Sequence, residues 1–240
     1  MDDDFAEARY ARLTWNAPLS ESHADELLDR LQLSPPTTIV DLGCGWGELL
    51  LRAASRAKPQ PGVLMTGVDT DAAALRRGRQ AARERGLDVS FVEQQAEDFQ
   101  GIRHRAICIG ASHALGGSRA MLERLAAIVP QGRVLVGDMC WERPPTEAAC
   151  AVFGNEVPML VDLVAMCRET GWEVLHLSTA DQREWDDFES RHRAGPREWL
   201  LTNFEHPRAL EIREQQDERE REYLTVYRGV LGFVYLVLGR

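Results

Sequence analysis

The 240-residue sequence has no apolar run close to the ~20 residues that a membrane-spanning helix needs. Its start, Met1 to Asp4, is acidic, whereas a secretory signal begins with basic residues. Basic residues are also in the minority, with 28 Lys and Arg against 38 Asp and Glu and a net charge of −10. We therefore expect a cytoplasmic protein that binds neither a membrane nor nucleic acid.

Zinc and disulfide signatures are also missing. The sequence contains neither a Cys-x-x-Cys pair nor paired histidines close to a cysteine. An odd number of cysteines argues against a disulfide framework. We expect reduced thiols and no metal site. The five cysteines are Cys44, Cys108, Cys140, Cys150 and Cys167.

The most informative stretch is 39–48, IVDLGCGWGE, an apolar run that ends in an acid and three alternating glycines. It predicts a strand, a tight turn and the start of a helix over 48–57. Glycine tolerates positive φ angles and lets a ligand approach the backbone, and the free N–H groups of a helix start attract a polar ligand. Asp69 ends the next predicted strand, where it can accept hydrogen bonds from ribose hydroxyls.

Predicted strands alternate with predicted helices along the chain, which indicates a parallel sheet with helices on both faces. The predicted strands begin at Ile39 and then cover 62–69, 89–93, 106–109, 133–138, 173–178 and 230–238. The predicted helices cover 20–33, ended by Ser34-Pro35-Pro36, and 48–57, 72–85, 118–128 and 158–169. Because 230–238 is almost wholly apolar, we expect that strand inside the sheet and not at its edge.

Residues 181–227 are charged and have a helical pattern, and we expect two or three helices interrupted at Gly195-Pro196 and His206-Pro207. The helix among these that covers 207–222 should be solvated, with an i,i+4 pair between Asp217 and Arg221. An aromatic stripe falls near one helical face and is expected to pack on the domain body. Its members are Trp185, Phe188, His192 and Trp199.

The spacing of the glycines separates two cofactors. A dinucleotide site needs Gly-x-Gly-x-x-Gly, whereas this chain has Gly-x-Gly-x-Gly followed by Glu48. Asp41, which precedes the turn, would repel a pyrophosphate but can hold an ammonium group. The turn therefore favours S-adenosylmethionine over NAD, and an NAD-dependent oxidoreductase is the alternative.

The stretch 40–47 together with Gly67-Val68-Asp69 resembles the class I S-adenosylmethionine-dependent methyltransferases over residues 35–240. The resemblance implies a Rossmann-like sheet of seven strands, in which the last is antiparallel and lies between the fifth and sixth. It makes 1–34 an N-terminal arm and helix, and 181–227 a helical insert. More narrowly, 108–117, 184–189 and 227–232 resemble an uncharacterised bacterial YjhP-like branch.

The resemblance also implies cofactor contacts. Asp41, Gly43 and Gly45 would lie near the methionine moiety and Asp69 near the ribose. At the adenine position, where relatives often have an acid, this chain has Gln94-Gln95, so Gln95, Glu97 or Asp98 could serve. The expected cofactor residues are Asp41, Gly43, Cys44, Gly45, Asp69, Thr70, Gln95, Ala96, Glu97, Ile109, Gly110 and Ala111.

Methyl transfer from a sulfonium is an in-line displacement for which positioning supplies much of the acceleration, so a base is optional. His113, after the fourth strand, is the candidate catalytic base, with a structural hydrogen-bonding role as the alternative. Asp138 and Glu142 come second, and helix capping or solvation explains them as well. Tyr223 and Tyr227 are expected to be packing residues whose hydroxyls are satisfied.

The expected acceptor is a small molecule methylated on oxygen or nitrogen, and a protein side chain is the second choice. The chain lacks the Asn-Pro-Pro-Tyr or Pro-Cys stretches and the basic channel of enzymes that methylate bases. A cofactor-binding module without catalysis is the alternative. The residues expected to line the acceptor site are Trp15, Ser112, His113, Trp141, Trp185 and Phe188.

Overall fold

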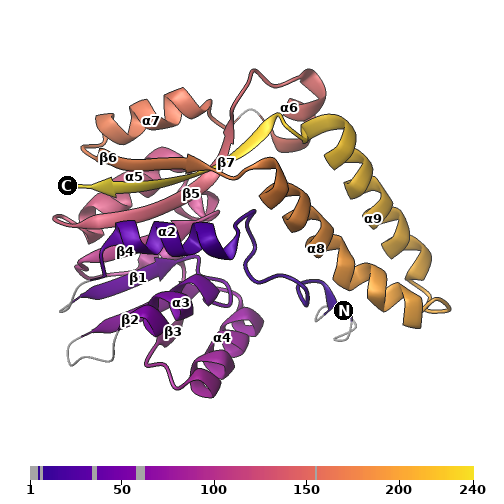
Figure 1. Ribbon diagram of the computed structural model, residues 1–240, viewed down its shortest axis with the longest axis horizontal. Coiled ribbons are helices and arrows are strands. Elements are labelled where there is room, and N and C mark those ends of the chain that lie inside the picture. Colours follow the sequence, from indigo (N-terminus) through magenta and orange to yellow (C-terminus); the bar gives the residue numbers. More distant parts are fainter. Residues whose placement is uncertain (1–4, 6–7, 34–36, 58–62, 155) are drawn as a thin grey trace.

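The computed structural model describes residues 5, 8–33, 37–57, 63–154 and 156–240. A seven-stranded sheet in the order β3-β2-β1-β4-β5-β7-β6 forms its centre (Figure 1). The strands are β1 (Thr38–Leu42), β2 (Leu64–Asp69), β3 (Ser90–Glu93), β4 (Arg105–Ile109), β5 (Arg133–Trp141), β6 (Glu173–Thr179) and β7 (Leu231–Gly239). No helix in the described part is long and apolar enough to cross a membrane.

Strand β7 is the only antiparallel member of this sheet and lies between β5 and β6, as the sequence predicts. All nine of its residues are buried, and it pairs with β5 from Leu231 opposite Trp141 to Gly239 opposite Arg133. Since the other six strands run in the same direction, their carboxyl ends lie along one edge of the sheet. The predicted Rossmann-like fold of the methyltransferase type is therefore confirmed.

Helices cover both faces of the sheet. The helices α2 (Glu21–Leu31) and α3 (Glu48–Arg56) pack on one face, and α5 (Ser118–Ile128) and α7 (Leu160–Glu169) on the other. Two further helices are α4 (Ala72–Arg85) and α6 (Glu147–Phe153). The sequence pattern did not reveal α6, which spans only seven residues. The predicted end of the first helix at 34–36 and the start of the second strand at Gly62 lie outside the described residues.

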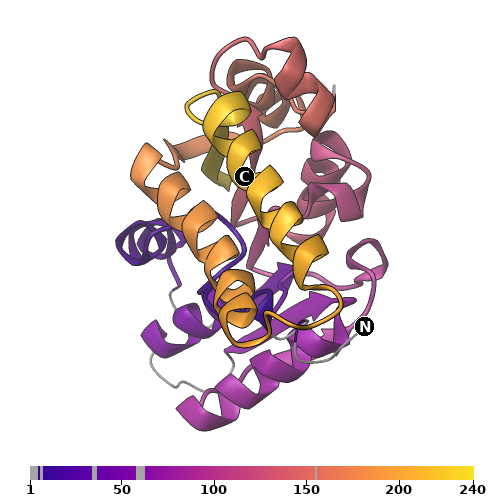
Figure 2. The same ribbon diagram turned by 90° about the vertical axis from the view of Figure 1, so that its right-hand side faces the viewer.

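The insert, residues 181–227, consists of α8 (Gln182–Thr202), α9 (Ala209–Glu222) and a π-helical turn (Tyr223–Tyr227). Figure 2 shows α8 and α9 side by side. The predicted break at Gly195-Pro196 is wrong, because α8 continues through both residues, which are buried in the middle of the helix. The predicted break at His206-Pro207 is confirmed. The connection between the two helices lies there.

The outer side of the insert is solvated, as expected, but its ion pairs differ from the prediction. Asp217 of α9 pairs with Arg197 of α8, 3.0 Å away, and Arg221 pairs with Glu218. The predicted pair of Asp217 with Arg221 is therefore wrong, because Asp217 faces the neighbouring helix. The tyrosine predictions are confirmed, since Tyr223 donates to Asp186 and Tyr227 donates to Glu189.

A partly buried group of hydrogen bonds joins α2 to the insert. The Nδ1 atom of His23 in α2 lies 3.0 Å from Oε1 of Glu184 in α8, and its Nε2 atom lies 2.7 Å from the Ser178 hydroxyl of β6. The backbone N–H of Ser20 donates to the same carboxylate. Burial works to raise the pKa of Glu184, but the hydrogen bonds from His23 and Ser20 outweigh it and lower the pKa to about 2.

This lowered pKa predicts an acid-dependent loss of stability. An acid whose pKa is lower in the folded state stabilises the fold above its ordinary value of 4.5, and the contribution disappears as the pH falls toward 2. We expect Glu184→Gln to lower the free energy of unfolding at pH 7 by about 1–3 kcal/mol and to flatten its dependence on pH between these values. Urea unfolding at several pH values measures both, with the exposed Glu173→Gln as the control. An unchanged pH dependence would contradict the prediction.

Candidate functional site

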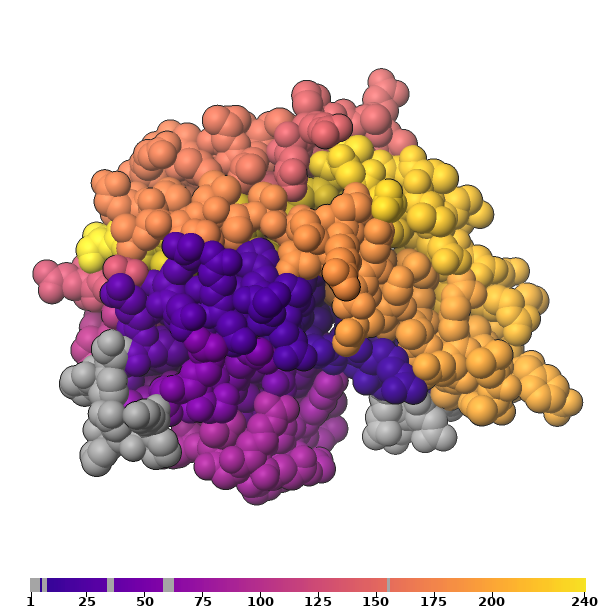
Figure 3. Space-filling model, in the orientation of Figure 1, coloured from indigo at the N-terminus to yellow at the C-terminus, as the bar shows by residue number. Residues whose placement is uncertain are grey.

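A cavity of about 2380 Å³ opens at the carboxyl edge of the parallel strands. It lies between the domain body, the insert and the N-terminal arm, residues 8–19. Figure 3 shows the indigo arm at the boundary between the purple body and the orange insert. Pockets for one small ligand are usually about 300–1,000 Å³, so this cavity has room for two ligands.

The expected cofactor residues come together at the body end of the cavity. Of the twelve, Glu97 alone is absent from the cavity wall. Glu97 lies in a 3₁₀ turn, Ala96–Asp98, whose first residue is buried. The eleven that line the cavity are Asp41, Gly43, Cys44, Gly45, Asp69, Thr70, Gln95, Ala96, Ile109, Gly110 and Ala111.

The three glycines of the turn after β1 have different physical roles. All three have left-handed φ angles, 71° at Gly43, 54° at Gly45 and 70° at Gly47. A Cβ at Gly43 would lie 2.3 Å from the Cβ of Ala111, and one at Gly47 would lie 2.4 Å from the Phe91 ring. At Gly45, nothing lies within 4 Å. The outer glycines therefore allow close packing, while Gly45 leaves open space at the cavity wall.

Asp69 at the end of β2 holds this turn in place. Its Oδ2 atom accepts from the N–H of Gly45 at 2.7 Å, and its Oδ1 atom accepts from the N–H of Asp71 at 2.9 Å. The N–H groups of Gly43 and Cys44 both donate to the carbonyl of Val68. These bonds orient the Asp69 carboxylate at the cavity wall and tie the β1 turn to the end of β2.

Asp41 is a buried acid on the cavity wall. Its side chain is 4 % exposed and accepts no hydrogen bond from the described residues. Burial raises its pKa to about 8, with a further contribution from the negative charge of Asp69. A buried carboxyl group that faces a cavity without a partner fits the ammonium group of an amino-acid moiety. The chemistry of this end of the cavity therefore suits S-adenosylmethionine.

Comparison with known proteins identifies the family. A model of the methyltransferase domain matches residues 39–132. The chain is 30 % identical over 234 residues to the uncharacterised protein YjhP of Escherichia coli, and the match covers 93 % of each. The chain belongs to the class I S-adenosylmethionine-dependent methyltransferases. Within this family it falls in the YjhP-like branch, as its sequence motifs indicate.

Two other relatives bear on this methyltransferase. A crystal structure of an S-adenosylmethionine-dependent methyltransferase from Geobacter sulfurreducens, in complex with S-adenosylhomocysteine, matches with a TM-score of 0.88 and 27 % identity, covering 100 % of this chain and 99 % of that one. Trans-aconitate 2-methyltransferase of Paracidovorax citrulli is 36 % identical over 120 residues, 48 % of this chain and 44 % of the relative. The cofactor of the methyltransferase is therefore S-adenosylmethionine, as the spacing of the glycines predicts.

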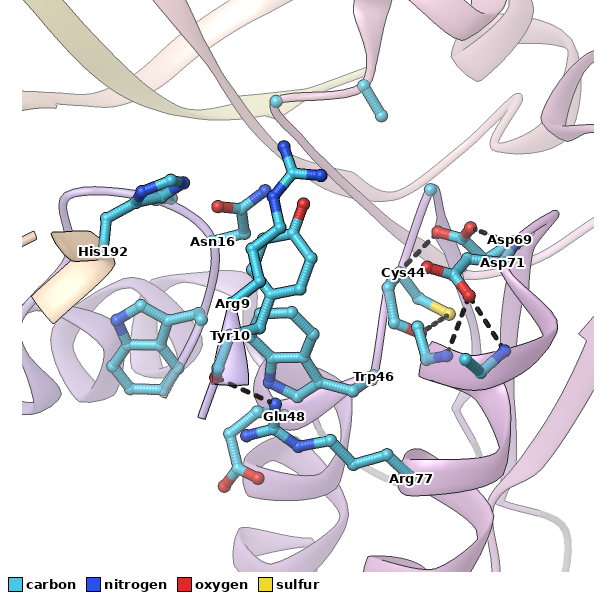
Figure 4. A pocket seen from close by; sticks show the side chains of 18 of the residues that line it. Arg9, Tyr10, Asn16, Cys44, Trp46, Glu48, Asp69, Asp71, Arg77 and His192 are labelled. Atoms are coloured by element: carbon cyan, nitrogen blue, oxygen red, sulfur yellow. Dashed lines mark hydrogen bonds between the residues drawn. The ribbon is translucent and has the colours of Figure 1, made fainter. Parts of the chain in front are cut away.

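The N-terminal arm closes one side of the cavity, through residues that sequence reasoning did not identify. Arg77 of α4 donates to the carbonyls of Tyr10 and Leu13 at 3.3 and 3.1 Å, and its guanidinium lies 4.4 Å over the Trp46 ring. Trp46 itself donates from Nε1 to the carbonyl of Thr14 at 2.6 Å. Figure 4 shows Trp46 and Arg77 beneath Tyr10. The arm is thus attached to the turn after β1, residues 43–47, which we call the cofactor turn.

The residues expected at the acceptor site separate into two groups. Trp15 and His113 line the cavity. Trp141 packs against Phe153, and Trp185 lies in the core beside Tyr227. The residues that do not line the cavity are Ser112, Trp141, Trp185 and Phe188. The acceptor roles expected for these six side chains remain predictions.

Asp138, the second candidate base, also lies away from the cavity wall. It is 7 % exposed, and burial raises its pKa. Its carboxylate accepts from the N–H of Met139 at 2.9 Å and from the hydroxyl of Ser118. These contacts agree with a structural role at the end of the parallel part of β5.

The insert supplies the opposite end of the cavity. His192 of α8 and Gln216 and Arg219 of α9 line it. Burial and the charges of Arg219, Arg9 and Arg193 lower the pKa of His192 to about 4, which keeps its ring neutral at pH 7. Its ring contacts the Tyr10 ring of the arm at 6.2 Å. The sequence offered His192 only as part of an aromatic stripe, so its place at the cavity was missed.

Proposed function

We propose that this methyltransferase methylates an oxygen or nitrogen atom of a small molecule that occupies the insert end of the cavity. One observation carries the proposal: a single cavity, too large for one small ligand, extends from the glycine turn to His192 and Gln216 of the insert. The net charge of −10 also supports a small acceptor over nucleic acid. A relative that methylates trans-aconitate acts on a small molecule by its name.

The residues of the chain bind and orient both partners in this proposal. When bound, the cofactor supplies a methyl group on a positively charged sulfur. Asp41 binds the ammonium group of its methionine moiety, Asp69 binds the ribose, and Gln95 accepts from the adenine amino group. The arm excludes water from the space between the two ligands, and the insert holds the acceptor in line with the methyl group.

His113 is the residue that we propose for proton removal. It is the exposed residue of a 3₁₀ turn, Ser112–Leu115, which follows the cavity-lining stretch 109–111 at the end of β4. An alcohol acceptor needs a base, and an imidazole on the cavity wall can take its proton as the methyl group is transferred. A phenolate or carboxylate acceptor reacts without this step.

The experiment that tests the function is a screen for methyl transfer. The protein is incubated with S-adenosylmethionine and pools of small carboxylic acids, phenols, alcohols and amines, and mass spectrometry detects S-adenosylhomocysteine and each methylated product. Parallel reactions contain transfer RNA or a bacterial protein extract. We expect a product in a small-molecule pool. Methylation of a macromolecule alone, or cofactor binding without transfer to any acceptor, would contradict the proposal.

The role of His113 is tested with the acceptor found in that screen. We expect His113→Gln to lower kcat by about 100-fold or more when the acceptor is an alcohol, because general-base catalysis contributes factors of about 10² to 10⁴. The affinity for S-adenosylhomocysteine, measured by calorimetry, should not change. His176→Gln on β6, outside the cavity wall, is the matched control. Wild-type turnover of His113→Gln with bound cofactor would exclude His113 as the base.

A further inference from the structure

The feature that leads further is the contact between the arm and the cofactor turn. Trp46 lies between Gly45 and Gly47 of that turn, and 8 % of its surface is exposed. Its indole N–H is bonded to the carbonyl of Thr14 in the arm. Its ring lies under the Arg77 guanidinium on one side and 5.8 Å from the Tyr10 ring. A residue of the cofactor turn therefore contacts the arm at two points.

Arg77 also joins the arm to this turn, through hydrogen bonds to the backbone of the arm. Within the described part of the chain, Arg77 forms no ion pair with a carboxylate. Its two side-chain hydrogen bonds go to backbone carbonyls of the arm, Tyr10 and Leu13. Carbonyl oxygens that accept from a guanidinium are held more strongly than those that accept from a neutral donor. Stacking on Trp46 fixes the guanidinium plane that makes these bonds.

Tyr10 lies between the two ends of the cavity. Its ring contacts Trp46 of the cofactor turn at 5.8 Å and His192 of the insert at 6.2 Å. Figure 4 shows the Tyr10 side chain among Arg9, Asn16 and Trp46, with His192 farther along. The backbone of Tyr10 is the one that Arg77 holds. Moving this segment would remove part of the cavity wall beside the acceptor but leave Asp41 and Asp69 in place.

We propose that Trp46 and Arg77 are positioning residues, which latch the arm segment 10–14 to the cofactor turn and so hold Tyr10 as a wall of the acceptor site. The effect on the acceptor rests on the proposed small-molecule function. The attachment of the arm by Trp46 and Arg77 does not depend on it. Because Trp46 belongs to the turn, the same latch links occupation of the cofactor site to the position of the arm. Bound cofactor therefore favours the docked arm, and the docked arm completes the acceptor site.

Arg77→Met tests the latch, because methionine keeps much of the apolar length but donates no hydrogen bond. We expect trypsin to cleave at Arg9 and Arg12 about tenfold faster than in the wild type, with or without acceptor. Bound S-adenosylhomocysteine should slow this cleavage in the wild type and lose that effect in the variant. The Kd for S-adenosylhomocysteine should change less than about threefold. Arg213→Met on the exposed side of α9 is the control, because it removes the same positive charge away from the arm.

Kinetics with the acceptor from the screen then separate positioning from mere stability. We expect the KM for the acceptor to rise about tenfold in Arg77→Met with kcat less affected, and Arg77→Lys to recover part of the loss because lysine still donates to a carbonyl. Trp46→Phe should keep the stacking but lose the hydrogen bond to Thr14. Its KM for the acceptor should lie between those of Arg77→Lys and Arg77→Met. Unchanged cleavage of the arm would overturn the latch. Faster cleavage with an unchanged KM would overturn the positioning role, and a macromolecular acceptor would overturn the proposed function but not the latch.

Discussion

Asp41→Asn should weaken the binding of S-adenosylmethionine by about a hundredfold and, at the same time, raise the Tm of the protein without ligand. Both effects have the same origin. In the proposed function the carboxylate of Asp41 binds the ammonium group of the cofactor, and loss of one charge-assisted interaction of this kind costs about 1.5–3 kcal/mol. Without the cofactor, the same carboxyl group is buried with no hydrogen-bonding partner among the described residues.

The pKa of Asp41 gives the sign of the stability effect. Its folded value of about 8 lies above the ordinary value of 3.8, so the folded state disfavours the ionised form. The unfolded chain loses its proton near pH 4, and stability is therefore lost progressively as the pH rises from about 4 to 8. Asparagine has nearly the same shape and cannot ionise. The gain in Tm should be largest at pH 8 and absent near pH 4.

The same pKa predicts a proton release on binding. A bound ammonium group favours the carboxylate, so cofactor binding below pH 8 expels the proton from Asp41, and the affinity rises with pH until about 8. Calorimetry in buffers with different ionisation enthalpies measures this proton directly. The affinity of Asp41→Asn should be weak and nearly independent of pH over this range. Equal proton release in the variant and the wild type would contradict the assignment.

Asp138→Asn provides the matched control, because Asp138 is also buried with a raised pKa but does not line the cavity. Its affinity for S-adenosylhomocysteine should equal that of the wild type. A similar loss of affinity in both variants would show that a buried charge at the strand ends acts on the fold and not on the ligand.

The strand order and the cofactor turn could be predicted because both depend on local sequence. Each strand or helix is indicated by a pattern that is contained within that element, as the apolar run of β7 shows. The distinct roles of the glycines could not be predicted. Gly43 must be small because of Ala111, which follows β4, and Gly47 because of Phe91 in β3, and both neighbours are far away in the sequence.

The acceptor end was harder to predict, because the sequence around an aromatic residue does not reveal whether its side chain lines a pocket or packs in the core. Trp141 and Trp185 are core residues, whereas Trp15 lines the cavity. Tyr10 and Arg77 carried no signal at all, since a guanidinium bonded to backbone carbonyls leaves no pattern in side-chain types. A hydrogen bond across 67 residues appears only in three dimensions.

Gly195→Ala should release the arm from the insert and lower kcat/KM for the acceptor by about tenfold or more, with little change in cofactor affinity. Alanine is normally preferred over glycine inside a helix by about 0.5–1 kcal/mol. At Gly195 the added Cβ would lie 2.0 Å from the carbonyl oxygen of Ala8, a backbone atom that cannot rotate away. This preference does not apply at Gly195, because Pro196 follows and a Cβ on the residue before a proline is disfavoured in a helix. The expected effect is therefore that the arm loses its place on α8.

The contact at Gly195 belongs to a row along α8. Arg12 of the arm pairs with Glu198 at 2.6 Å, and Tyr10 lies against His192. The ion pair is exposed, with half or more of each side chain in solvent, and contributes at most about 1 kcal/mol. Close backbone packing at Gly195 is thus the part of this row that a single methyl group can disrupt. Steady-state kinetics and tryptic cleavage at Arg9 and Arg12 measure the result.

A chain that lacks residues 1–18 distinguishes an effect of Gly195→Ala on the arm from an effect on α8 itself. Removal of the arm should itself lower kcat/KM, and unchanged acceptor affinity would count against any role of the arm. In the shortened chain the Ala8 carbonyl is absent, so Gly195→Ala should leave the remaining turnover unchanged. If Gly195→Ala lowers the turnover of the shortened chain as well, the substitution acts on α8 itself and not through the arm. If the full-length variant keeps wild-type turnover, the arm does not need this contact, and the insert end of the cavity functions without it.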